Sequence, residues 1–146
     1  MTITDVDCDV YTNTKTIIVT DTNPTASCLV SSNNIVEGNR VRFNSPSTAY
    51  DTPIISWDWT VDGISVNDSA DFVYLFAQNG TYVVNLTVTD NDGSADTVSQ
   101  TIVVNDTLPV SGFVYSPVSP HESQTIQFNS TSSAYDGVVS YLWSFG

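Results

Sequence analysis

The chain has 146 residues, and its 16 Asp and Glu residues against 3 Lys and Arg residues give a formal net charge of −13. A surface this acidic repels phosphate groups, so we expect no binding to nucleic acid. No apolar run approaches the roughly 20 residues of a membrane span, so we expect no membrane insertion of this segment. The charge fits cation binding, high salt or simple solubility.

The chain repeats itself. When it is aligned with itself at an offset of 85, 20 of the 51 pairs that begin with Met1 and Leu86 are identical, without a gap. We interpret residues 1–22 as the C-terminal strands of one repeat, 23–107 as a complete repeat, and 108–146 as the N-terminal half of a third. The segment is thus expected to be a window of a longer array, or a subunit whose half-domains are completed by other copies.

Within the complete repeat the pattern predicts strands and no helix. Alternation is clearest from Thr81 to Thr89, where every second residue from Tyr82 to Val88 is apolar. Such a strand has one face on a core and one in water. The predicted strands, in chain order, cover residues 26–30, 40–45, 54–61, 72–76, 81–89 and 98–104. In the third of these, Ile55, Trp57, Trp59 and Val61 are expected to share the inner face. The short linker at residues 105–109 ends in proline, which predicts neighbouring domains held in line.

Two motifs carry a family resemblance. The run Gly80-Thr81-Tyr82-Val83-Val84-Asn85-Leu86-Thr87-Val88-Thr89-Asp90-Asn91-Asp92-Gly93 resembles the signature of the polycystic kidney disease (PKD) domain. A second motif has an aromatic residue, one further residue, a Trp and then a Gly turn, and it occurs at Trp57 to Gly63 and again at Tyr141 to Gly146. The family usually has Phe-Gly-Asp-Gly after this Trp, so Val61-Asp62-Gly63 departs from it.

The resemblance implies an all-β chain of tandem immunoglobulin-like sandwiches, and an extracellular or cell-surface location. It places Trp59 and its copy Trp143 in the cores of their domains. It also places Tyr82 at a tyrosine corner, where the hydroxyl group of the side chain binds a nearby backbone group.

The residues give little support to catalysis. His121 is the only histidine, and no nucleophile and base accompany it, so the chain is not expected to be an enzyme. No cofactor is required by any motif. Calcium is the one ion that the sequence suggests, because Asp90 and Asp92, with their counterparts Asp5 and Asp7, alternate like the ligands of a calcium loop. Asp-Gly after a strand is also ordinary hairpin chemistry. Asp62 and Asp136 are further candidates.

Other side chains suggest modification or binding. Five Asn-x-Ser/Thr sequons predict N-linked glycans at Asn67, Asn79, Asn85, Asn105 and Asn129. Cys8 and Cys28 are expected to lie too far apart for a disulfide within the chain. Tyr50, Tyr74 and Tyr135 could belong to a polysaccharide platform or simply to packing.

We therefore expect a non-enzymatic structural module that forms a rod, surface layer or filament through contacts with neighbouring repeats or copies of itself. Two alternatives stay open at this point. The segment could be a spacer in a secreted hydrolase, such as a polysaccharide hydrolase or a protease, or a calcium-dependent adhesion module.

Overall fold

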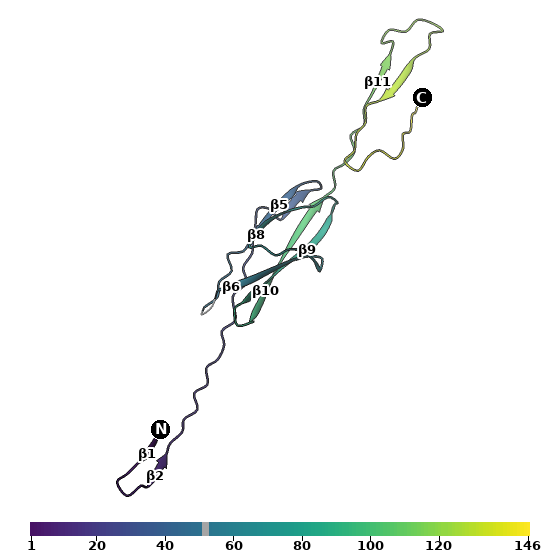
Figure 1. Ribbon diagram of the computed structural model, residues 1–146. Coiled ribbons are helices and arrows are strands. Elements are labelled where there is room, and N and C mark those ends of the chain that lie inside the picture. The colour runs from purple at the N-terminus through teal and green to yellow at the C-terminus, as the bar shows by residue number, and fades with distance from the viewer. Residues whose placement is uncertain (51–52) are drawn as a thin grey trace.

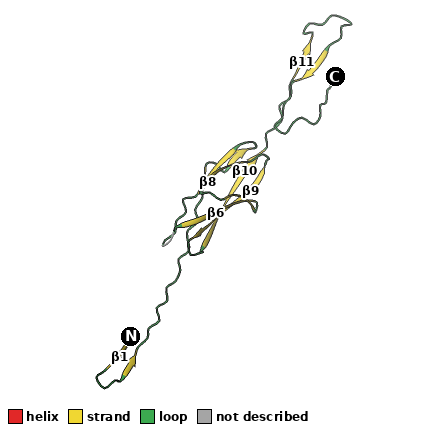
Figure 2. Ribbon diagram, viewed as in Figure 1, coloured by secondary structure: helices red, strands yellow, loops and turns green. Residues whose placement is uncertain are grey.

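The computed structural model describes residues 1–50 and 53–146. Every regular element in this part of the chain is a strand (Figure 2). The molecule is long and thin, with the N- and C-termini at opposite ends and a sandwich in the middle (Figure 1). The strands are β1 (Thr2–Thr4), β2 (Val10–Thr12), β3 (Leu29–Val30), β4 (Asn34–Val36), β5 (Arg40–Asn44), β6 (Ile54–Val61), β7 (Ile64–Asn67), β8 (Asp71–Leu75), β9 (Gly80–Asp90), β10 (Ala95–Asn105), β11 (Phe113–Ser116) and β12 (Gln127–Ser130).

The sandwich has two sheets. One has five strands in the order β4-β10-β9-β6-β7, and the other has three in the order β3-β5-β8. All neighbouring strands are antiparallel except β4, which runs parallel to β10 along the edge of the larger sheet. β9 and β10 are the longest strands, with 11 residues each, and they form the middle of the larger sheet.

The core lies between the two sheets and follows the alternation of β9. Val84, Leu86 and Val88 are fully buried, while Thr81 and Val83 on the other face are exposed. Trp59 is fully buried as well, and its indole Nε1 donates to the carbonyl oxygen of Ser69 over 2.9 Å. Its ring packs against those of Phe43 and Phe72, which stack on each other. Burial of apolar surface of this kind is the main term that stabilises the fold.

Tyr82 is placed at the start of β9 and is half-buried. Its hydroxyl group donates to the carbonyl oxygen of Gln78 over 2.9 Å, and its ring packs on Phe76. The hydroxyl group thus binds backbone at a corner, as the sequence resemblance implies.

The inner face of β6 differs from the expected alternation. Ile55 is 57% exposed, whereas Ile54 and Trp57 pack against the core. The cause is an irregularity in the pairing with β9 between Ile54 and Ser56, which shifts the alternation by one residue. The prediction that Ile55 points inward was therefore wrong.

Two hairpins flank the sandwich. β1 pairs with β2 near the N-terminus, and β11 pairs with β12 near the C-terminus. Trp143, expected in a core, is 39% exposed, although its ring contacts Phe113 and Phe128. No second sheet packs over these aromatic rings within the described residues, so they line an open hollow of about 800 Å³.

Candidate cation site at the sandwich edge

The site is built around the turn between β4 and β5. Gly38 in this turn has a positive φ of 77°, a conformation that favours glycine, and its N–H donates to the carbonyl oxygen of Phe76 over 2.8 Å. The N–H of the preceding Glu37 donates to the carbonyl oxygen of Asn105 over 3.0 Å. This bond continues the pairing of β4 with β10, and it places Glu37 beside the residues that leave β10.

Glu37 is one of only two polar residues that are buried in the described part of the chain, with 3% of its surface exposed. Its Oε1 accepts the backbone N–H of Thr107 over 2.9 Å. Its Oε2 is buried and has no hydrogen-bond partner among the described residues. A buried carboxylate with an unpaired oxygen is costly, because water no longer solvates it.

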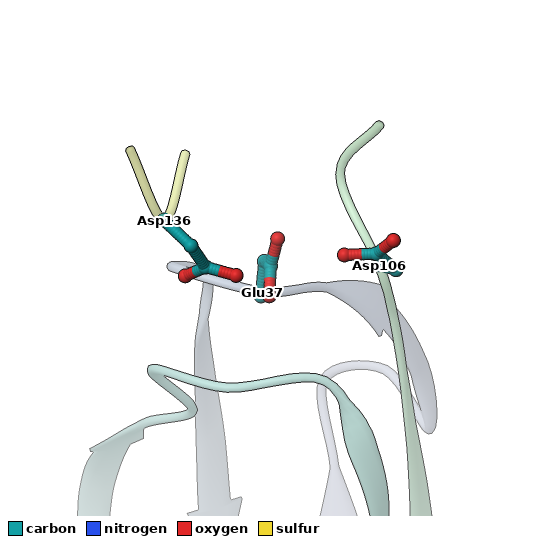
Figure 3. A group of neighbouring side chains, drawn as sticks. All are labelled: Glu37, Asp106 and Asp136. Atoms are coloured by element: carbon teal, nitrogen blue, oxygen red, sulfur yellow. The ribbon is translucent and has the colours of Figure 1, made fainter. Parts of the chain in front are cut away.

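Two more carboxylates lie around Glu37. Asp106 follows β10, and Asp136 lies in a turn of the segment after the sandwich, where the N–H of Gly137 donates to the carbonyl oxygen of Ala134. One oxygen from each of Glu37, Asp106 and Asp136 lies within 4.8 Å of the others. Figure 3 shows Glu37 between the two exposed aspartates, which come from different segments of the chain.

Further contacts beside the carboxylates join the sandwich to the segment that follows it. A Cβ atom at Gly38 would come within 2.7 Å of the ring of Tyr135, so a larger residue at this position would force the ring to move. The side-chain nitrogen of Gln78 lies 3.5 Å from Oδ1 of Asp136. The site is therefore a junction between the sandwich and residues 108–146.

The aspartates that the sequence analysis proposed as calcium ligands lie in two other turns, away from this cluster. Oδ1 of Asp90 accepts the N–H of Ser94 over 2.9 Å, and Oδ1 of Asp92 lies 3.3 Å from the same nitrogen. In the first hairpin, Oδ1 of Asp5 accepts the N–H groups of Asp7 and Asp9, both over 3.0 Å. Within residues 1–50 and 53–146, neither pair belongs to a group of three potential metal ligands. The Oδ2 of Asp90 is buried and unpaired in the same part of the chain.

Of the two further candidates, Asp62 lies in the two-residue turn between β6 and β7, with positive φ at Asp62 and Gly63. Its Oδ1 accepts the N–H of Val83 over 2.8 Å, so its role in the structure is that of a turn residue. Only Asp136 joins the carboxylate cluster.

The sequence reasoning missed Glu37 and Asp106. A sequence signal was present, because each of the three carboxylates recurs in the repeat. At the offset of 85, Asp21 matches Asp106, Glu37 matches Glu122, and Asp51 matches Asp136. Asp51 lies outside the described residues. The glutamate gives no sign in sequence that it is buried.

The sequons differ in how free their side chains are. Asn79 is exposed and makes no side-chain hydrogen bond to the described residues. The amide group of Asn85 is half-buried and bonded to Ser99 and Thr60, and Nδ2 of Asn105 donates to Ile35 and Asn34. Oδ1 of Asn67 accepts the N–H of Ser69, and Oδ1 of Asn129 accepts from Gln127. The side-chain nitrogens of the exposed Asn79 and Asn129 thus make no hydrogen bond to the described residues, whereas those of Asn85 and Asn105 do.

The remaining candidates are scattered. His121 is exposed, and its backbone N–H donates to the side chain of Gln124. Cys8 is exposed and Cys28 half-buried, and both thiols are free. Burial raises the pKa of the Cys28 thiol from 9.0 to about 11. Tyr50 is 87% exposed, while Tyr74 packs edge-on against Phe76 inside the sandwich. In the part of the chain that the structure describes, we find no helix of the length and apolarity that a membrane crossing needs.

Comparison with known proteins gives a consistent result. A family model for the PKD domain matches residues 21–105. The pre-pro-metalloprotease PrtV of Vibrio cholerae serotype O1 is 32% identical over 112 residues, which are 75% of this chain. The chain spans only 12% of the length of that relative.

Solved structures agree with the family model. The crystal structure of the PKD1 domain of PrtV is 32% identical, with a TM-score of 0.51 over 57% of this chain and 99% of that domain. The PKD1 domain of Vibrio anguillarum Epp is 24% identical, with a TM-score of 0.51 over 58% of this chain and 96% of that domain. The second likeness shows the fold alone.

Proposed function

Because this chain belongs to the PKD domain family, we propose that it is a non-catalytic accessory module of a secreted protease. The observation that carries the proposal is the identity of 32% to PrtV, a pre-pro-metalloprotease, both in the full relative and in its PKD1 domain. The comparisons favour this reading over the rod or filament that the sequence first suggested. An extracellular location follows from the same proposal.

The site supports a positioning role rather than chemistry. The carboxylate cluster lies where the sandwich meets the next segment, and its neighbours Gly38 and Tyr135 are in close contact. A module that fixes the direction of its neighbours can hold a catalytic domain at a set distance from a surface or substrate.

A test is to isolate the native protein with antibodies raised against residues 23–107 and to sequence its peptides by mass spectrometry. We expect peptides of a protease catalytic domain on the same polypeptide. A polypeptide that consists only of further repeats of about 85 residues would contradict the proposal. The purified chain alone should hydrolyse no protein substrate, and activity that survives repurification would show that the module itself is catalytic.

We also infer that residues 1–22 and 108–146 are parts of domains like the sandwich. The support is the register of the two hairpins. Thr2 pairs with Thr12 as Thr87 pairs with Thr97, at an offset of 85. Val114 pairs with Asn129 as Leu29 pairs with Asn44, at the same offset.

This repeated register is the observation that favours a second candidate function, a rod or filament of stacked domains. Electron microscopy of the native source material distinguishes the two functions. Continuous fibres with a bead at each domain length are expected of a rod, and separate particles with one larger globule are expected of a protease with spacer domains.

A further inference from the structure

Residues 108–146 expose an apolar face of the kind that the sandwich buries. Four apolar side chains of this segment are between 36% and 72% exposed, namely Ile126, Phe128, Trp143 and Phe145. At an offset of 85 for the first two and 84 for the last two, they match four buried core residues of the complete repeat, Val41, Phe43, Trp59 and Val61. Three of them line the open hollow of about 800 Å³. A contiguous apolar face of this kind marks an interaction site on a folded protein.

Residues 1–22 expose the other half of the same core. Their apolar side chains Met1, Ile3, Ile17 and Val19 are each more than half exposed. At the offset of 85 they match Leu86, Val88, Ile102 and Val104, which are buried on β9 and β10. Together the two segments hold an apolar counterpart for eight of the ten buried apolar residues of the sandwich, all but Phe76 and Val84. The two exposed faces are therefore complementary parts of one core.

The backbones of the two segments are unpaired along matching edges. In the sandwich, β9 lies between β10 and β6. β1 matches the C-terminal part of β9, but among the described residues it pairs with β2 alone. Residues 138–145 match β6, yet they form no strand and make no backbone hydrogen bond to the rest of the described chain. An unpaired strand edge readily accepts another strand. β1 thus lacks the kind of neighbour that residues 138–145 supply.

We propose that residues 1–22 of one copy pair with residues 108–146 of a second copy, so that a shared core forms between the two copies. A single copy does not make this contact, because the two segments lie on opposite sides of the sandwich (Figure 1). The register follows from the sandwich, where Thr87 of β9 pairs with Asp58 of β6. Their counterparts Thr2 and Leu142 therefore pair between the copies, which brings Met1 opposite Trp143.

The contact is head to tail, so it leaves one free surface of each kind on every pair of copies. Such a contact repeats and builds open chains of molecules. The proposal rests on the inference that both flanking segments are parts of domains like the sandwich, and it goes beyond the accessory role. The shared core has no counterpart of residues 62–85, which include β7 and β8. We therefore expect each joint to be weaker than the sandwich and to dissociate on dilution.

The test measures the molar mass of the whole chain by sedimentation equilibrium between about 10 and 500 µM, where weak protein contacts form and dissociate. The buffer holds about 0.5 M NaCl, because salt screens the repulsion between copies with a net charge of −13 each. Two variants, Ile3→Asp and Trp143→Asp, place a charge in the shared core, one from each side. Near-UV circular dichroism checks that the sandwich of each variant is folded.

The matched controls are Val6→Asp and Leu142→Asp, which add the same charge outside the shared core. Val6 is 97% exposed and Leu142 is 98% exposed. Their counterparts in the complete repeat, Asn91 and Asp58, are exposed as well. The average mass of the wild type and of both controls should rise with concentration. Ile3→Asp and Trp143→Asp should each keep the mass of one chain. A wild type that stays monomeric at about 500 µM, or controls that behave like the two core variants, would overturn the proposal.

A mixture of Ile3→Asp and Trp143→Asp is the sharpest sample. Each variant keeps one intact surface, and the two intact surfaces are of opposite kind. The mixture should therefore form a dimer and nothing larger, although neither variant associates alone. A mixture that stays monomeric, or one that forms long chains, would contradict a head-to-tail contact between these two segments.

Disulfide trapping tests the register. Thr2→Cys and Leu142→Cys are prepared separately in a chain in which Cys8 and Cys28 are serine, and the two are mixed and oxidised. Directly opposite residues of paired strands have Cβ atoms about 4.5–5.5 Å apart, so the mixed disulfide should form. Thr4→Cys is the control, because it lies diagonal to Leu142 at about 7–8 Å and should react more slowly. Equal rates would refute the register. The peptide sequencing described above tests the accessory role separately, so failure here leaves that role intact.

Discussion

The ring of Tyr135 lies against Gly38 so closely that a Cβ atom on the glycine would come within 2.7 Å of it. The two residues belong to different segments, and their contact lies beside the junction where Glu37, Asp106 and Asp136 meet.

Replacing Gly38 with alanine should open this junction. Gly38 and Gly63 have similar positive φ values of 77° and 81°, so alanine at either position carries a backbone strain of about 1–2 kcal/mol. A Cβ at Gly63 meets no atom of the described residues within 4 Å, which makes Gly63→Ala the matched control. Nuclear Overhauser contacts between the Tyr135 ring and residue 38 should disappear only in Gly38→Ala. If they persist there, the contact tolerates a Cβ and the steric argument fails.

Trp59 and Trp143 occupy equivalent sequence motifs but should contribute very differently to stability. Trp59 is fully buried, so Trp59→Ala should lower the free energy of unfolding by roughly 3–5 kcal/mol. Trp143 is 39% exposed, and Trp143→Ala should cost less than about 2 kcal/mol. Urea unfolding followed by circular dichroism measures both. Equal losses would mean that the aromatic cluster around Trp143 is buried in solution.

The hydrogen bond of Tyr82 can be tested by removing one atom. Tyr82→Phe keeps the ring that packs on Phe76 but loses the bond to the carbonyl oxygen of Gln78, and it should cost about 0.5–1.5 kcal/mol. The control is Tyr74→Phe, since the Tyr74 hydroxyl group makes no hydrogen bond to the described residues. Its unfolding free energy should change by less than about 0.5 kcal/mol. If Tyr74→Phe lowered the free energy of unfolding as much as Tyr82→Phe, the hydrogen bond of Tyr82 would not explain the loss.

Cys28 should be the less reactive of the two thiols. Burial raises the pKa of Cys28 to about 11, and the thiolate is the reactive form, so iodoacetamide at about pH 8 should alkylate the exposed Cys8 first. Because the folded pKa is raised, the contribution of Cys28 to stability is complete below about pH 9. It is then lost as the pH rises towards 11. Cys28→Ser should reduce this alkaline loss of stability, measured as Tm against pH. Equal alkylation rates of Cys8 and Cys28 would contradict the burial of Cys28.

Sequence reasoning works best where a long strand has one buried face. The alternation from Tyr82 to Val88 predicts β9, and Val41 and Phe43 predict β5, because a period of two places these side chains on one side. β4 was not predicted. It has three residues, of which only Ile35 is half-buried, and its parallel pairing with β10 joins residues about 70 positions apart. Nothing local in the sequence specifies such a contact.

The candidate site is harder to predict for a similar reason. Asp136 was among the candidates, but Glu37 and Asp106 become its neighbours only when β4 pairs with β10 and the next segment folds onto Gly38. Ile55 shows the same limit on a smaller scale, since one irregular pairing with β9 reverses the side that the residue faces. In both cases a contact between distant segments decides where the side chain lies.

The parallel pairing of β4 with β10 has a mechanical consequence. The chain enters the sandwich on the side of β3 and β4 and leaves it directly from the end of β10. A pulling force on the two ends would therefore act along these neighbouring strands in opposite directions. Their hydrogen bonds, among them the bonds from Val103 to Asn33 and from Glu37 to Asn105, would be loaded in shear and all at once. Bonds loaded in this way have to break together rather than one after another, so the sandwich should resist stretching far better than a hairpin that is opened from its end.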